Sequence, residues 1–99
     1  MIDLSKIELK DFANILGSEM VIHAAERKNV LAEIAEVTAL EGYSPLERTP
    51  FSLVIKTKDQ NVYPQQIFEV IHQQYGSIAI FFTPIKKDNT GVSYNAIFS

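Results

Sequence analysis

Three short runs of β-branched and aromatic residues in the last third of the chain most restrict its fold. They cover residues 64–72, 77–85 and 92–98. Tyr75-Gly76 separates the first from the second, and a polar stretch ending in Gly91 separates the second from the third. Strand-forming runs divided by glycine-containing breaks predict an antiparallel meander.

The length and the missing cysteines limit the remaining possibilities. A chain of 99 residues supports one hydrophobic core, so we predict a single domain over residues 1–99. Without cysteine there is no disulfide, no thiolate nucleophile and no cysteine-bound zinc. No apolar run approaches the roughly 18 residues of a membrane span, and the acidic N-terminus is unlike a secretory signal. We expect a protein made in the cytoplasm, without membrane association, that either stays there or joins a larger particle.

The charge distribution argues against nucleic-acid binding. The net charge is −3, and residues 1–50 carry nine acidic and five basic side chains. Basic residues are adjacent only at Arg27-Lys28 and Lys86-Lys87. Phosphate neutralisation requires a clustered positive surface. We therefore expect no nucleic-acid partner, and instead a protein partner or a homo-oligomer.

The N-terminal segment carries the pattern of a helix. Ser5-Lys6-Ile7-Glu8 matches a capping box, which predicts a helix over residues 6–16. Gly17 stands where a left-handed residue would end it. The expected apolar face is formed by Leu9, Phe12, Ala13 and Leu16.

Residues 19–27 and 30–41 differ in how clearly their patterns predict secondary structure. Residues 19–27 alternate well enough to predict a strand that ends at Lys28-Asn29. Residues 30–41 have helical spacing, and Asn29 is a possible cap. A strand is the alternative for this segment, and it would place Glu33 and Glu36 on opposite faces.

Residues 51–57 form the clearest strand before the final third, and residues 42–50 form a surface loop. The loop contains two prolines and a glycine, which exclude regular structure. The strand alternates, with Phe51, Leu53 and Ile55 on the expected core face and Ser52, Val54 and Lys56 on the other.

Several motifs resemble a family of small bacterial domains of unknown function. Asp11-Phe12 with Leu16-Gly17 matches an Asp-Phe-x-x-x-Leu-Gly motif, residues 50–53 give Pro-Phe-Ser-Leu, and residues 81–85 give Phe-Phe-x-Pro-Ile. The resemblance covers nearly the whole chain, although Gln73 stands where the family usually has proline. It implies that residues 30–40 are a strand, and it lends no activity.

Together these features predict a mainly β fold. We expect a small antiparallel β-barrel or bent sheet of about six strands, with one N-terminal helix packed on it or plugging it. Residues 77–85 are apolar on both faces, so either the helix or a subunit interface should cover the outer face. Ile80 and Phe82 are expected to point inward. Alternating spacing favours core packing over a ligand platform for the aromatic residues Phe51, Phe68, Phe81, Phe82, Tyr94 and Phe98.

Few residues suggest chemistry. Glu69 and His72 have a spacing that helices use for metal sites, but on a strand they point to opposite faces. The same holds for His23 and Glu26. A transition-metal site needs convergent ligands that the chain does not group together, and no nucleophile elbow or phosphate loop is present. We expect no catalytic residue, no metal and no cofactor.

The sequence thus favours a non-catalytic interaction or structural module over an enzyme. Its proposed partner contacts are Tyr43, Leu46 and Arg48 in the loop, aromatic, apolar and guanidinium types common at interfaces. An association with a phage-tail-like or fibre assembly is one setting for such a module. The first alternative is a small-molecule or metal-binding enzyme with a site inside the barrel formed by His72, Glu69 and Tyr94. The second is a binder that neutralises a partner protein.

Overall fold

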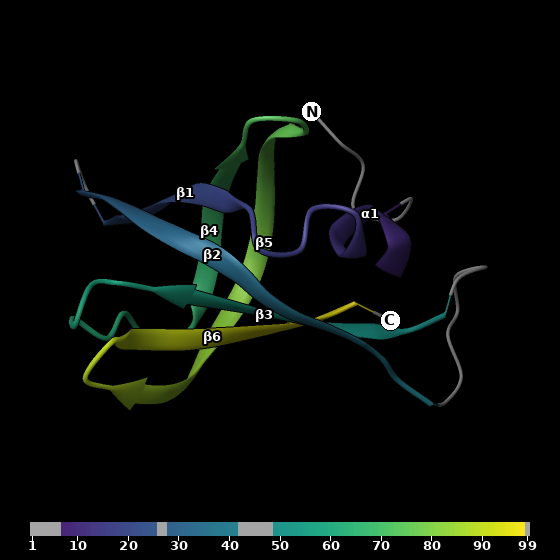
Figure 1. Ribbon diagram of the computed structural model, residues 1–99. Coiled ribbons are helices and arrows are strands. Elements are labelled where there is room, and N and C mark those ends of the chain that lie inside the picture. The colour runs from purple at the N-terminus through teal and green to yellow at the C-terminus, as the bar shows by residue number, and fades with distance from the viewer. Residues whose placement is uncertain (1–6, 26–27, 42–48, 99) are drawn as a thin grey trace.

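The chain folds into a closed antiparallel β-barrel with one short helix, seen in a computed structural model that describes residues 7–25, 28–41 and 49–98 (Figure 1). The elements are α1 (Leu9–Ala13), β1 (Glu19–Ala25), β2 (Lys28–Ala39), β3 (Phe51–Thr57), β4 (Gln66–His72), β5 (Gly76–Asp88) and β6 (Gly91–Phe98). Around the barrel the order is β1-β2-β3-β6-β5-β4. This confirms the predicted fold class. No helix in the described part of the chain is long and apolar enough to cross a membrane.

Barrel closure depends on β5, which changes its partner along its length. Its first half, from Gly76 to Phe82, pairs with β4. Its second half, from Thr83 to Asp88, pairs with β6, with an irregularity in register between Pro84 and Lys86. The ring closes where β1 pairs with β4.

The barrel interior is filled by alternate side chains of the strands. In β3, Phe51, Leu53 and Ile55 are fully buried, as predicted. In β5, Ile80 and Phe82 point inward as predicted, whereas Phe81 is 52% exposed. The assignment of Phe81 to the core was therefore wrong, because adjacent strand residues face opposite sides. The other five aromatic residues assigned to the core are buried: Phe51, Phe68, Phe82, Tyr94 and Phe98.

The helix is shorter than predicted and begins later. Its N-cap is Glu8, whose backbone N–H donates to the Asp11 carboxylate at 2.8 Å, while the Glu8 side chain accepts from the Asp11 backbone. The observed capping box thus pairs Glu8 with Asp11, and the one predicted at Ser5 lies outside the described residues. Leu16, expected on the apolar face, is 55% exposed because the helix has already ended.

After the helix the chain attaches to β2. Gly17 has a φ of 86°, as predicted for a left-handed residue, and its N–H donates to the Ile34 carbonyl at 2.9 Å. The Ile34 N–H donates in return to the Ser18 carbonyl at 3.0 Å. This pair of hydrogen bonds directs the chain into β1.

Three aromatic rings hold the helix at one end of the barrel, beside the extended ends of β2, β3 and β6 (Figure 1). Phe51 and Phe98 stack with ring centroids 4.7 Å apart, and Phe12 contacts both at 6.0 and 5.6 Å. The Tyr75 hydroxyl also donates to the Asp11 carbonyl at 3.0 Å. The helix therefore packs on the barrel as predicted.

Residues 30–39 lie in a strand, as the family resemblance implied and against their helical spacing. β2 pairs with β1 on one side and β3 on the other, with a bulge between Ile34 and Glu36. The bulge adds one residue, so Glu33 and Glu36 are both exposed and do not lie on opposite faces.

Glycine is required at position 91, where β6 begins. Gly91 has a φ of 147°, and a Cβ built there would lie 1.6 Å from the Thr57 carbonyl oxygen. We expect Gly91→Ala to lower the free energy of unfolding by about 3 kcal/mol or more, because the backbone at Thr57 or at residue 91 must move to make room for the added Cβ. Gly76→Ala is the matched control, since its φ is also positive but no atom lies within 4 Å of the added Cβ. Equal urea midpoints for the two variants would contradict this account.

Phe81 and Phe82 provide a direct test of strand parity. Phe82→Ala should cost about 3–5 kcal/mol, because it leaves a cavity in the core. Phe81→Ala should cost about 1 kcal/mol or less, because that ring is half exposed. Thermal unfolding of both variants measures the difference, and similar losses would show that the parity is wrong.

Candidate functional site

Side chains of the described residues fill most of the barrel interior. Its cavity measures about 10 Å³ and is lined by Ile22, Val30, Ile55, Thr57, Tyr63, Phe68, Phe82 and Tyr94. A volume of that size holds at most one water molecule. The Tyr94 hydroxyl accepts a hydrogen bond from the Tyr63 backbone N–H at 3.1 Å, and burial raises the pKa of Tyr94. That hydroxyl therefore supports the segment before β4.

The structure does not bring His72, Glu69 and Tyr94 together. Glu69 points outward and forms an ion pair with the His23 Nδ1 at 2.8 Å. His72 is buried at the β4 end nearer the helix, while Tyr94 packs edge-on against Phe68 with centroids 6.0 Å apart. Within the described residues no group of three potential metal ligands converges.

His23 and Glu26 have the spacing of a metal site in the sequence, but Glu26 lies outside the described residues. Its observed partner, Glu69, belongs to a strand far along the chain. The loop residues Tyr43, Leu46 and Arg48 also lie outside the described residues. Of the residues proposed from the sequence as site residues, the structure therefore describes His23, Glu69, His72 and Tyr94.

A serine–histidine pair that sequence reasoning missed lies beside the helix. The Ser18 Oγ is 2.9 Å from the His72 Nε2, although 54 positions separate the residues. The His72 Nδ1 accepts the Gln74 backbone N–H at 3.0 Å. The Ser18 hydroxyl donates to the Ile15 carbonyl.

These hydrogen bonds fix the protonation of the pair. Because Nδ1 accepts an amide proton, Nε2 carries the hydrogen of the neutral ring and donates it to Ser18. A general base would have to accept the serine proton at Nε2 instead. Burial also lowers the pKa of His72. The pair is arranged to join the end of β4 to the chain after α1, and not to activate a nucleophile.

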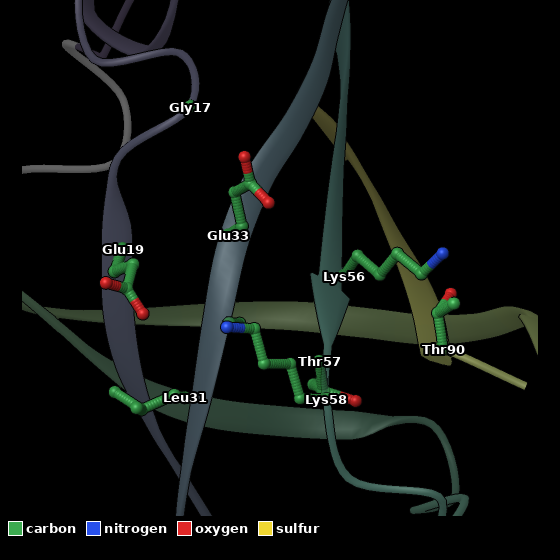
Figure 2. Close-up of a pocket in the computed structure, with 9 residues that line it drawn as sticks. Gly17, Glu19, Leu31, Glu33, Lys56, Thr57, Lys58 and Thr90 are labelled. Atoms are coloured by element: carbon green, nitrogen blue, oxygen red, sulfur yellow. The ribbon is translucent and has the colours of Figure 1, made fainter.

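A polar groove of about 420 Å³ lies on the outside of the barrel, between the start of β1 and the end of β3 (Figure 2). It is lined by Gly17, Glu19, Leu31, Ala32, Glu33, Lys56, Thr57, Lys58 and Thr90. Glu19 and Glu33 are direct cross-strand partners, and Lys56 is opposite Glu33 on β3. Two neighbouring carboxylates therefore line the groove on its β1 and β2 side.

The two lysines of the groove behave differently. Lys56 points toward Thr90 and pairs with Asp88 at 3.3 Å (Figure 2). The Thr90 hydroxyl and backbone N–H, together with Lys56, hold the pKa of Asp88 well below its usual range, so this pair stays ionised. Lys58 reaches across the groove toward β2 (Figure 2). Lys58 therefore shares the groove with the two glutamates, whereas the Lys56 ammonium pairs with Asp88.

Apolar side chains cover part of the outer surface formed by β2, β1, β4 and β5. Ile67 and Phe81 are direct cross-strand partners and are 68% and 52% exposed. Pairing also aligns Leu31, Val21 and Ile71 in a row across three strands. We call this surface the outer apolar face, and it consists of Val21, Leu31, Ile67, Ile71, Ala79 and Phe81.

These features define a small closed barrel with a packed interior and its distinctive side chains on the outside. The chain belongs to the family described as "Domain of unknown function (DUF6916)", which it matches over residues 7–98. This confirms the resemblance to a family of small domains of unknown function. Comparison with curated proteins and with solved structures gives no match.

The buried His72 predicts a specific pH dependence of stability. Because burial lowers the pKa of the folded ring below its ordinary value of 6.5, the unfolded chain binds the proton more readily. The contribution to stability is full above that value and is lost as the pH falls through the lower, folded pKa. Urea unfolding between about pH 7.5 and pH 5 should show this loss in the wild type and a smaller one in His72→Gln. The control His23→Gln should keep it, and equal slopes in wild type and His72→Gln would contradict the assignment.

Proposed function

We propose that this domain is a non-catalytic module that binds a partner protein through its outer apolar face. The observation that carries the proposal is the exposed pair Ile67 and Phe81, which meet across β4 and β5. Single exposed apolar residues are ordinary, whereas contiguous ones on a sheet are typical of interaction sites. Val21, Leu31 and Ile71 form a second apolar row over β2, β1 and β4, on the other side of Glu69 and His23.

The free energy gained by burying the outer apolar face is sufficient for binding. Burying an isoleucine or phenylalanine side chain contributes about 1.5–3 kcal/mol relative to leaving it exposed. A face with several such side chains, together with a few polar contacts, supports a specific complex once the cost of association is included. Folding gains little from these residues, since their exposed parts make no core contacts.

The arrangement of polar groups also favours binding over catalysis. The interior cavity is too small for a substrate, and the hydrogen bonds of His72 keep it from acting as a base toward Ser18. The phage-tail-like or fibre setting and the neutralising binder are narrower forms of the same proposal that differ only in the partner. The loop residues Tyr43, Leu46 and Arg48 remain a proposed second contact.

Site-specific photo-crosslinking tests the proposal. A photoreactive residue at position 67, introduced into the full chain in cells that produce it, should form a discrete adduct with one partner protein. The same residue at position 97 is the control, because Ile97 is 60% exposed on β6, outside the outer apolar face. Phe81→Ser should reduce the adduct at position 67 about tenfold, the loss expected for an interface anchor.

Two results would count against this function. One is the same set of adducts at positions 67 and 97, which would indicate nonspecific proximity. The other is an adduct at position 67 that Phe81→Ser leaves unchanged although the variant remains folded.

A further inference from the structure

Carboxylates lie both beside the outer apolar face and within it. Glu19 and Glu33 lie next to the row of Leu31, Val21 and Ile71. Each glutamate is two residues along its strand from that row, on the same face of the sheet. Glu69 lies on the other side of that row, between Ile71 and Ile67 on β4. An approaching molecule that covers the apolar side chains must therefore also meet these three carboxylates.

The side chains around the face compensate the carboxylates only in part. His23 pairs with Glu69. Lys56 is held by Asp88, and Lys58 shares the groove with the glutamates. Within the described residues neither the Glu19 nor the Glu33 side chain forms an ion pair or a hydrogen bond. The face thus consists of two apolar groups, the Ile67–Phe81 pair and the row of Leu31, Val21 and Ile71, with Glu69 and His23 between them. Its edge at Glu19 and Glu33 is negative.

Like charges directly opposite each other across two strands are unfavourable. Covering the two carboxylates with an uncharged surface would add a desolvation cost. A lysine or arginine of the partner would compensate both their mutual repulsion and their desolvation. The apolar face and its carboxylates therefore call for a partner of particular chemistry.

The same charges disfavour a second copy of this chain as the occupant. In a two-fold symmetric contact the same patch meets itself. Glu19, Glu33 and Glu69 of one copy would then be brought against their equivalents. Juxtaposed like charges at an interface cost several kcal/mol.

We propose that the outer apolar face binds a basic, amphipathic segment of a partner protein, with its lysine or arginine side chains placed at Glu19 and Glu33. This rests on the proposed function and identifies the chemistry of the partner. The apolar side chains of the segment lie on Ile71, Ile67 and Phe81.

Two peptides of equal length, in which leucine alternates with either lysine or glutamate, test the proposal at concentrations where each is monomeric. Titration of the isotopically labelled full chain, followed by NMR, should show saturable shifts of β1, β4 and β5 amides with the lysine peptide. Binding should weaken as salt is raised, because part of the attraction is electrostatic. The glutamate peptide should bind about tenfold more weakly or not at all.

Matched variants separate local recognition from overall charge. Glu19→Gln with Glu33→Gln should weaken the lysine peptide about fivefold. Glu36→Gln with Glu41→Gln changes the net charge equally but lies outside the face, and should leave the affinity unchanged. Phe81→Ser should also weaken binding, whereas Ile97→Ser should not.

Several outcomes would overturn the proposal. These are equal binding of both peptides, equal losses in the two double variants, and shifts centred on other strands. A dimer in sedimentation that Phe81→Ser dissociates would show that the occupant is a second copy. A specific crosslink at position 67 without a lysine preference would reject the basic partner and leave the proposed function standing. A lysine preference without any specific crosslink would reject the proposed function instead.

Discussion

The barrel depends on the change of hydrogen-bonding partner within β5, from β4 to β6. Pro84 lies at this change, and the register irregularity that follows it lets the strand bend between its two neighbours. The bend closes the ring on one side, but it leaves the far ends of β2, β3 and β6 extending past it. The rings of Phe12, Phe51 and Phe98 cover that end, so the short helix is part of the closure.

Strands that alternate strictly could be predicted from the sequence. β3 and the first half of β5 bury every second residue, and period-two reasoning placed their inward side chains correctly apart from Phe81. β2 misleads because its bulge brings Ile34 and Val37, three residues apart, onto the core side. A three-residue apolar spacing is also the mark of a helix, so local pattern alone could not separate the two.

The contacts of the candidate site could not be predicted in the same way. The His23–Glu69 and Ser18–His72 pairs each join segments far apart in the sequence, and both arise from the closing pair of β1 with β4 or from the turn leading into it. Nothing within either segment specifies that register. The helix start was predicted too early because Ser5-Lys6-Ile7-Glu8 matches a capping box by sequence, whereas the observed box pairs Glu8 with Asp11.

The two faces of β5 serve different needs, and this is what connects the fold to function. Ile78, Ile80 and Phe82 are buried and cannot be lost without opening the core. Phe81 occupies the same strand but makes little contribution inside, and an exposed aromatic on a sheet adds a risk of aggregation. In the proposed complex, the neighbouring carboxylates Glu19 and Glu33 limit that risk by repelling a second acidic copy. The same carboxylates would favour a basic partner, so in this proposal one set of charges both discourages self-association and selects the partner.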